Sequence, residues 1–166
     1  MELPKRKPAR IKGYDYSQNG YYFITICTQN KQKVLSRIVG EGLPLPQLTP
    51  EGKIAERLIL KVNEKYPFAS VNKYVIMPNH IHIILCLNVD GRGNPSPTVS
   101  NVIGWLKYNI TKQINKNKGT VGNRFFQRSF HDHIIRGEKD YLKIWEYIND
   151  NPARWREDCF FCDCGE

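Results

Sequence analysis

Two histidines, and farther along the chain a tyrosine and an asparagine, have the residue types and spacing to support chemistry. His80 and His82 stand one residue apart in the apolar stretch MPNHIHIIL, directly after Pro78 and Asn79. Side chains alternate across a β-strand, so both imidazoles should lie on the same side and could bind one metal ion. An isolated pair is also compatible with two partly buried polar histidines that bind nothing, and the spacing alone does not separate these interpretations.

Tyr147 and Asn151 lie four residues apart in WEYINDNP. This spacing would place them on one face of a helix, where both could reach the same metal centre. Pro152 should bias Asn151 away from helical geometry and leave it at the fraying end of the helix. Taken alone, each residue has an ordinary structural explanation, Tyr147 as a core or surface aromatic residue and Asn151 as a helix-ending residue.

The elements that must position these residues are predicted from periodicity and turn residues. Thr49 and Pro50 favour a helix start after the loop 40–50, and apolar residues recur at helical spacing across 99–116. The order is strand, helix, two strands, helix, strand and a final helix. It predicts an α+β fold, ferredoxin-like (RRM-like), with an antiparallel sheet, helices on one face and a C-terminal helix that carries the tyrosine. The expected strands span 21–28, 73–77, 80–87 and 130–136, and the expected helices span 51–66, 99–116 and 138–150.

Length and charge limit the class of protein. The chain has 166 residues, which suits one domain, and its 25 Lys and Arg against 16 Asp and Glu give a net charge of +9, which favours a polyanionic partner. No stretch approaches the roughly 20 apolar residues of a membrane helix, and the basic N-terminus has no signal-peptide pattern. We expect a basic arm over 1–13, one domain over 14–155 and a cysteine-containing tail over 156–166. The basic residues of the arm are Lys5, Arg6, Lys7, Arg10 and Lys12.

The five cysteines indicate a reducing compartment. Cys27 and Cys86 lie in strand-like apolar stretches and are expected to be reduced core residues. Cys159, Cys162 and Cys164 crowd a short tail that lacks a fourth zinc ligand. We therefore predict a cytoplasmic protein, with no membrane partner and no zinc site in the tail.

Taken together, these stretches resemble the single-tyrosine HUH transposases of the IS200 type, and more closely the REP-associated tyrosine transposases of bacteria. The resemblance covers roughly residues 13 to 155 and runs in the family's order. Its most specific part is His-Ile-His after Met-Pro-Asn, followed by Tyr-Ile-x-x-Asn-Pro. The matching stretches are GYDYSQNGYYFITICTQNKQ, YVIMPNHIHIIL and RFFQRSFHDHIIRGEKDYLKIWEYINDNP.

The resemblance implies a role for each of the four residues. His80 and His82 would bind a divalent metal with Asn151, and Tyr147 would attack single-stranded DNA to give a 5′-phosphotyrosine and a free 3′-OH. Two imidazoles and an amide oxygen with open positions suit Mg²⁺ or Mn²⁺ better than a closed zinc site. The implied DNA partner is a single strand or a hairpin formed by a REP-like palindrome, and the implied assembly is a monomer or a homodimer.

Further contacts to DNA are expected around this site. The basic arm, together with Lys107 and Lys112 on the second long helix, could bind hairpin phosphates. In FHDH, His131 and His133 repeat the one-residue spacing of the first pair but lack its Pro-Asn turn and apolar strand. We expect them on the sheet face close to the site, with His133 near a phosphate, although a four-histidine cluster is conceivable.

Two other functions stay open from the sequence. One is a non-catalytic module that binds single-stranded DNA or RNA on an RRM-like sheet, with YYFITICT supplying stacking aromatics, but the RNP1 signature of that fold is absent. The other is a metallo-phosphodiesterase that hydrolyses DNA without a tyrosyl intermediate. It would still cut after Tyr147→Phe but not after His80→Ala.

Overall fold

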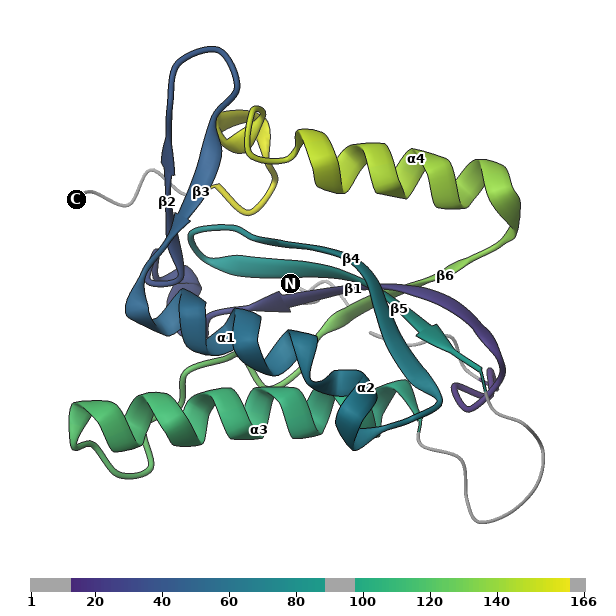
Figure 1. The fold of residues 1–166 in the computed structure, drawn as a ribbon, viewed down its shortest axis with the longest axis horizontal. Coiled ribbons are helices and arrows are strands. Elements are labelled where there is room, and N and C mark those ends of the chain that lie inside the picture. The colour runs from purple at the N-terminus through teal and green to yellow at the C-terminus, as the bar shows by residue number, and fades with distance from the viewer. Residues whose placement is uncertain (1–12, 89–97, 162–166) are drawn as a thin grey trace, which may run out of the picture.

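The main sheet of the protein has four antiparallel strands in the order β4-β5-β1-β6, as seen in a computed structural model that describes residues 13–88 and 98–161 (Figure 1). Together with the helices between the strands, this order is the predicted ferredoxin-like α+β arrangement. The strands pair over most of their length, and Cys27 at the end of β1 lies opposite His80 at the start of β5. The strands are β1 Gly20–Cys27, β4 Ala69–Ile76, β5 His80–Leu87 and β6 His131–Ile135.

Helices cover both faces of this sheet (Figure 1). One face packs against α1 and α3 in the larger hydrophobic core, and α4 lies on the other face over a smaller core. The prediction of helices on one face plus a separate C-terminal helix is thereby confirmed. The helices are α1 Pro50–Leu60, α2 Val62–Lys65, α3 Val99–Lys118 and α4 Gly137–Asp150.

Successive side chains of strand β5 point alternately into the two cores. Ile81, Ile83 and Leu85 are buried in the larger core, whereas Ile84 is buried in the smaller core beneath α4. His80 and His82 lie on the same side as Ile84, as the period of a strand predicts. The histidine pair is therefore placed between the sheet and α4.

A second sheet was missed by the sequence analysis. Strands β2 Ser36–Val39 and β3 Leu45–Leu48 form an antiparallel hairpin, so the prediction of a loop across 40–50 was wrong in its second half. The prolines there suggested a loop, but Pro46 lies in a two-stranded ribbon opposite Ile38. An edge strand tolerates proline because the side of the strand without a partner needs no N–H donor.

Helix ends follow local capping, with two departures from prediction. The Thr49 side chain accepts from the Gly52 N–H at 3.1 Å and starts α1, as expected, but the predicted long helix breaks at Lys61 into α1 and α2. Asn151 was predicted to leave helical geometry before Pro152, yet its backbone keeps φ −56° and ψ −41°. The preference imposed by a following proline is a bias, and packing overrides it here.

The remaining described chain forms two short 3-10 turns, η1 Gln29–Lys31 and η2 Trp155–Glu157. The second follows α4 and turns the chain back toward the sheet. In the part of the chain that the structure describes, no helix combines the length and the apolar character needed to cross a membrane.

Candidate metal and nucleophile site

The two predicted histidines face one another at the start of β5. Their Nε2 atoms lie 3.0 Å apart, and both side chains are buried, with exposed fractions of 0% for His80 and 1% for His82. Two imidazole nitrogens at this separation can bind the same ion, because their lone pairs converge on one region. The prediction that the pair shares one strand face is confirmed.

Each imidazole is held through its other nitrogen. His80 Nδ1 lies 2.8 Å from Asn79 Oδ1, and the Asn79 amide is itself fixed because its Nδ2 donates to the Phe160 carbonyl at 2.9 Å. His82 Nδ1 lies 2.8 Å from the Thr25 hydroxyl. A partner that accepts at Nδ1 leaves Nε2 without a proton and free to bind a metal, which is the usual arrangement of metal-binding histidines.

Burial keeps both histidines neutral. It lowers the pKa of His80 to about 4, an effect that the nearby Asp158 carboxylate opposes only in part. The pKa of His82 lies well below its ordinary value, first because of burial and then because of the neighbouring His80. At neutral pH both side chains are therefore in the form that ligates metals.

Helix α4 brings the predicted tyrosine and asparagine to the same place. Ile144 and Ile148 anchor the helix in the smaller core, and the Tyr147 hydroxyl lies 3.4 Å from His82 Nε2. Tyr147 remains 41% exposed, so a substrate can approach this side chain from solvent. Asn151 is buried, and its Oδ1 has no hydrogen-bond partner among the described residues.

Asp158 completes the cluster, and the sequence analysis missed it. Its Oδ2 accepts from Asn151 Nδ2 at 2.8 Å, lies 3.3 Å from the Tyr147 hydroxyl and lies 3.9 Å from His80 Nε2. Ligand atoms of Asp158 and the two histidines lie within 4.8 Å of one another. No local sequence pattern marks this residue. It lies in the segment 156–166, which was predicted to be a separate tail.

The first part of that tail is a cover over the site. The Phe160 ring lies 4.6 Å from the His80 ring and 5.9 Å from the His82 ring, between centroids. The Phe160 N–H donates to Asp158 Oδ1 at 2.7 Å, which fixes the carboxylate relative to the ring. Trp155 adds a contact at 5.9 Å from His80. The rings of Trp155 and Phe160 therefore lie against the histidine pair.

The environment of Tyr147 disfavours its anion when no cation is present. Burial, followed by the charge of Asp158, raises the pKa of Tyr147 to about 12. A nucleophilic phenol in this position thus needs an added positive charge close by to become reactive at neutral pH.

The donor set fits a divalent cation. Two neutral imidazoles and the Asp158 carboxylate converge there. The amide of Asn151 contacts that carboxylate through Nδ2, and among the described residues its Oδ1 has no hydrogen-bond partner. A buried carbonyl oxygen without a partner is costly in the absence of a ligand, and a cation would satisfy it. Mixed nitrogen and oxygen donors of this kind bind divalent metals.

The other residues that were predicted to contact DNA lie in several different places. His133 pairs with Asp140 at 2.8 Å on the exposed side of β6, while His131 is exposed and its ring is 6.1 Å from Phe160. Neither lies in the metal-ligand cluster described above, although His131 is close to it. Lys112 is exposed and stands 5.9 Å from the ring of Tyr108. The five basic residues of the predicted N-terminal arm lie outside the described residues.

Lys107 forms hydrogen bonds within the protein that the sequence did not indicate. Its ammonium donates to three backbone carbonyls, those of Gln127, Arg128 and Ser129, at 2.7, 3.0 and 3.4 Å. Its donors are thus engaged by the protein itself.

The cysteines Cys27, Cys86 and Cys159 are free thiols, in agreement with the predicted reduced state of the first two, whereas Cys162 and Cys164 lie outside the described residues.

Comparison with known proteins points to one family. The sequence model of the family described as "Transposase IS200 like" matches residues 16–151. The chain is 32% identical over 174 residues to an uncharacterized protein of Haemophilus influenzae, covering 95% of this chain and 94% of that protein. It is 27% identical over 139 residues to the REP-associated tyrosine transposase of Escherichia coli K12, covering 84% of this chain and 70% of that protein.

A solved structure has the same fold. The structure of a REP-associated tyrosine transposase bound to a REP hairpin matches with a TM-score of 0.59 at 22% identity. The match covers 88% of this chain and 74% of the other.

Proposed function

We propose a function from the premise that the chain belongs to the IS200-like transposase family: it cuts and rejoins single-stranded DNA by a metal-dependent reaction of Tyr147. The observation that carries this proposal is the position of the Tyr147 hydroxyl, 3.4 Å from His82 Nε2 and 3.3 Å from Asp158 Oδ2. A nucleophile thus stands at the edge of a set of metal-binding side chains while remaining open to solvent. The predicted ligands are His80, His82 and Asn151, and Asp158 is added to them here.

In the proposed reaction the Tyr147 oxygen attacks the phosphorus of a phosphodiester. A bond forms between the phenolic oxygen and phosphorus, and the bond from phosphorus to the 3′-oxygen breaks. The phenolic proton leaves toward solvent past Asp158 Oδ2, which accepts a hydrogen bond from the hydroxyl, and the departing 3′-oxygen takes up a proton from solvent. The products are a 5′-phosphotyrosine and a free 3′-OH. Because one phosphodiester is exchanged for another, the strand can be rejoined by reversal without an added energy source.

The side chains around Tyr147 supply positioning. The rings of Phe23 and Tyr147 pack edge to face, with 6.0 Å between their centroids and 89° between their planes. This contact limits rotation of the tyrosine ring. Hydrogen bonds at Nδ1 hold both imidazoles, and a fixed site gains rate because the reacting atoms need no further ordering. Mg²⁺ or Mn²⁺, when bound, would act as a Lewis acid on the phosphate and favour the tyrosinate.

The proposed partner is hairpin DNA with a single-stranded flank. Three observations support it: the net charge of +9, the similarity to REP-associated tyrosine transposases, and the hairpin bound in the structure of similar fold. A basic protein gains affinity for DNA by displacing counterions from phosphates. Either a monomer or a homodimer agrees with the placement of all the proposed residues on one chain.

A covalent adduct tests the proposal. Labelled single-stranded DNA carrying an imperfect palindrome is incubated with Mg²⁺ or Mn²⁺ and analysed on a denaturing gel. We expect a protein–DNA adduct with wild type and with Tyr141→Phe, a matched change on the same helix, but none with Tyr147→Phe or after EDTA. Cleavage that persists in Tyr147→Phe and stops in His80→Ala would indicate a metallo-phosphodiesterase. Tight binding without cleavage in either metal would indicate a non-catalytic binding module.

A further inference from the structure

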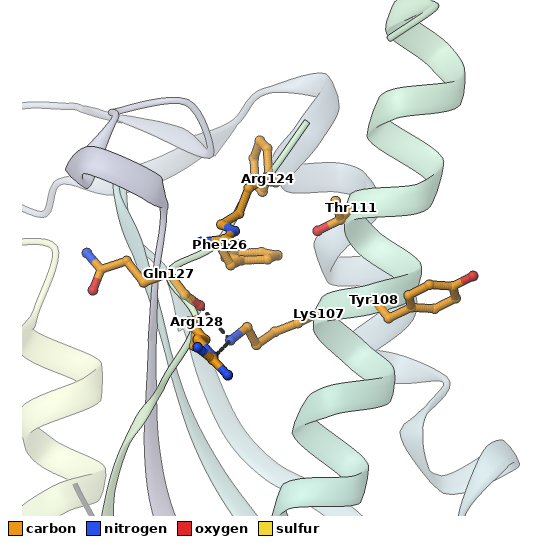
Figure 2. A pocket seen from close by; sticks show the side chains of 8 residues that line it. Lys107, Tyr108, Thr111, Arg124, Phe126, Gln127 and Arg128 are labelled. Atoms are coloured by element: carbon orange, nitrogen blue, oxygen red, sulfur yellow. Dashed lines mark hydrogen bonds between the residues drawn. The ribbon is translucent and has the colours of Figure 1, made fainter. Parts of the chain in front are cut away.

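A basic cavity lies apart from the metal-ligand cluster, between α3 and the segment that leads into β6. It is a shallow pocket, open to solvent, with a volume of about 470 Å³. Figure 2 shows the segment running beside the helix, with Lys107 and Thr111 directed toward it and Tyr108 directed away. Three lining residues are cationic and none is acidic. The lining residues are Lys107, Tyr108, Thr111, Arg124, Phe125, Phe126, Gln127 and Arg128.

Two of the cations are available to a ligand. Arg124 and Arg128 are both exposed, and within the described residues neither guanidinium has a hydrogen bond or an ion pair. By contrast, Lys118 at the end of α3 is paired with Glu51 at 2.7 Å. A guanidinium presents its donors as a planar fork that matches two oxygens of a phosphate.

Lys107 holds the wall of the cavity. Its three bonds to the carbonyls of residues 127–129 tie the segment to α3 from within (Figure 2). Burial lowers the pKa of Lys107, although the three acceptors solvate its charge. Lys107 is therefore a positioning residue, and its contacts set where Arg128 leaves the backbone.

Hydrogen bonds of the backbone and of side chains connect this wall with the histidine site. Gln127 N donates to the Cys27 carbonyl at 2.9 Å, and Phe126 forms a β-bridge with Thr28. The Thr28 hydroxyl donates to the Asn79 carbonyl at 3.0 Å, and the Asn79 side chain contacts His80. The cavity and the metal ligands are thus held at a fixed separation by one continuous network.

The chain direction also links the two places. The segment from Arg124 runs directly into β6, whose first residue, His131, lies opposite Thr25 in the sheet and beside Phe160. The ends of β1, β5 and β6 that meet here are those nearest to the metal-binding side chains. The cavity lies on the α3 side of the sheet and Tyr147 on the α4 side, so a DNA strand would have to pass round this end of the sheet to reach both.

We propose that this cavity binds the sugar-phosphate backbone of the DNA strand that is cut at Tyr147, with Arg124 and Arg128 each contacting a phosphate of the single-stranded flank. The inference rests on the proposed function, because it takes DNA as the substrate. Within the described residues, both guanidinium groups are without a hydrogen bond or an ion pair, and no acidic residue lines the cavity. The hydrogen-bonded connection to the histidine site adds to this, and together these features favour a polyanion. An acidic peptide is the competing ligand, and the test separates it.

The salt dependence of binding tests the inference. Tyr147→Phe protein, which cannot react, is titrated with a labelled hairpin carrying a single-stranded flank at several salt concentrations. Each phosphate contact on a single strand contributes about −0.7 to the slope of log K against log salt, so Arg124→Gln with Arg128→Gln should reduce its magnitude by about 1.4. Lys61→Gln with Lys65→Gln removes the same charge outside the cavity and should leave the slope unchanged. Arg124→Lys with Arg128→Lys should restore most of the slope.

The outcomes separate the inference from the proposed function. If Tyr147→Phe protein does not bind the hairpin at all, the proposed function fails. If it binds and the arginine variant has the same slope as the lysine control, DNA binding stands and the cavity inference is wrong. If the arginine variant keeps its DNA slope but loses binding to a poly-glutamate probe, the cavity takes an acidic peptide and the inference is overturned.

Discussion

Asn151 Nδ2 donates a hydrogen bond to Asp158 Oδ2 at 2.8 Å, and this contact joins the last helix to the turn that folds back over the histidines. It also orients the Asn151 amide, so that Oδ1 is the atom left without a partner among the described residues. The carboxylate thus has two effects on the site. In the proposed site it would add an anionic ligand beside the imidazoles, and it would present the amide oxygen of Asn151 to a bound cation.

The first prediction concerns the metal. Asp158→Asn should weaken Mn²⁺ binding by about 10- to 100-fold, the range found when a partner of metal ligands is removed, because both effects of the carboxylate are lost. Isothermal titration calorimetry of the protein without DNA measures this directly. Asp150→Asn, a change at an exposed residue at the end of α4, is the control. Equal Mn²⁺ affinity in wild type and Asp158→Asn would exclude Asp158 from the ligand set.

The second prediction concerns the cover. Phe160→Ala should speed the modification of His80 and His82 by diethyl pyrocarbonate, because the ring that lies 4.6 Å from His80 shields the imidazoles from solvent. Phe161→Ala, whose ring instead packs on Trp155 at 5.2 Å, should leave the rate close to that of wild type. Peptide mass spectrometry after timed exposure gives both rates. An unchanged rate in Phe160→Ala would mean that the sheet and α4 alone shield the pair.

The third prediction concerns acid stability. The ordinary pKa of histidine is 6.5, and burial lowers that of His80 to about 4 in the folded state, so between these values the unfolded chain binds a proton that the folded chain does not. Stability is therefore fully present above pH 6.5 and falls as the pH drops toward 4, by about 3 kcal/mol for His80, with His82 adding in the same direction.

Urea unfolding of the metal-free protein at several pH values measures this loss. His80→Gln should flatten the dependence between pH 6.5 and 4, while the exposed His131→Gln should preserve it. A wild-type stability that stays constant across this interval would contradict the assigned burial of neutral histidines.

The fourth prediction concerns the anchoring of α4. Ile148 is 1% exposed in the smaller core, so Ile148→Ala should lower the free energy of unfolding by about 2–5 kcal/mol. Leu142→Ala on the same helix, where the side chain is 51% exposed, should change it by less than about 0.5 kcal/mol. Chemical denaturation compares the two variants. Similar small losses in both would show that α4 is not held through this core.

Local periodicity was sufficient for much of the fold and for showing which side chains of the candidate site share a face, whereas the roles of His80, His82, Tyr147 and Asn151 were inferred from the family resemblance. Strand β5 began at His80 as predicted, because an apolar run after a Pro-Asn turn has few other solutions. The shared face of His80 and His82 follows from the two-residue period of a strand, and the shared face of Tyr147 and Asn151 from the helical period. The departures at Pro46 and Asn151 arose because proline preferences are biases that neighbouring strands and packing can override.

The sequence by itself thus determined which side chains share a face within one element, since that depends only on the backbone geometry of the element. Tertiary structure alone decided which faces meet. It brought Asp158 and Phe160, which no spacing distinguishes, onto the histidines, and it turned Lys107 toward three carbonyls of a distant segment. These contacts join residues that are 20 or more positions apart, and their partners are selected by packing and by the need of buried polar groups for hydrogen bonds, which no local pattern records.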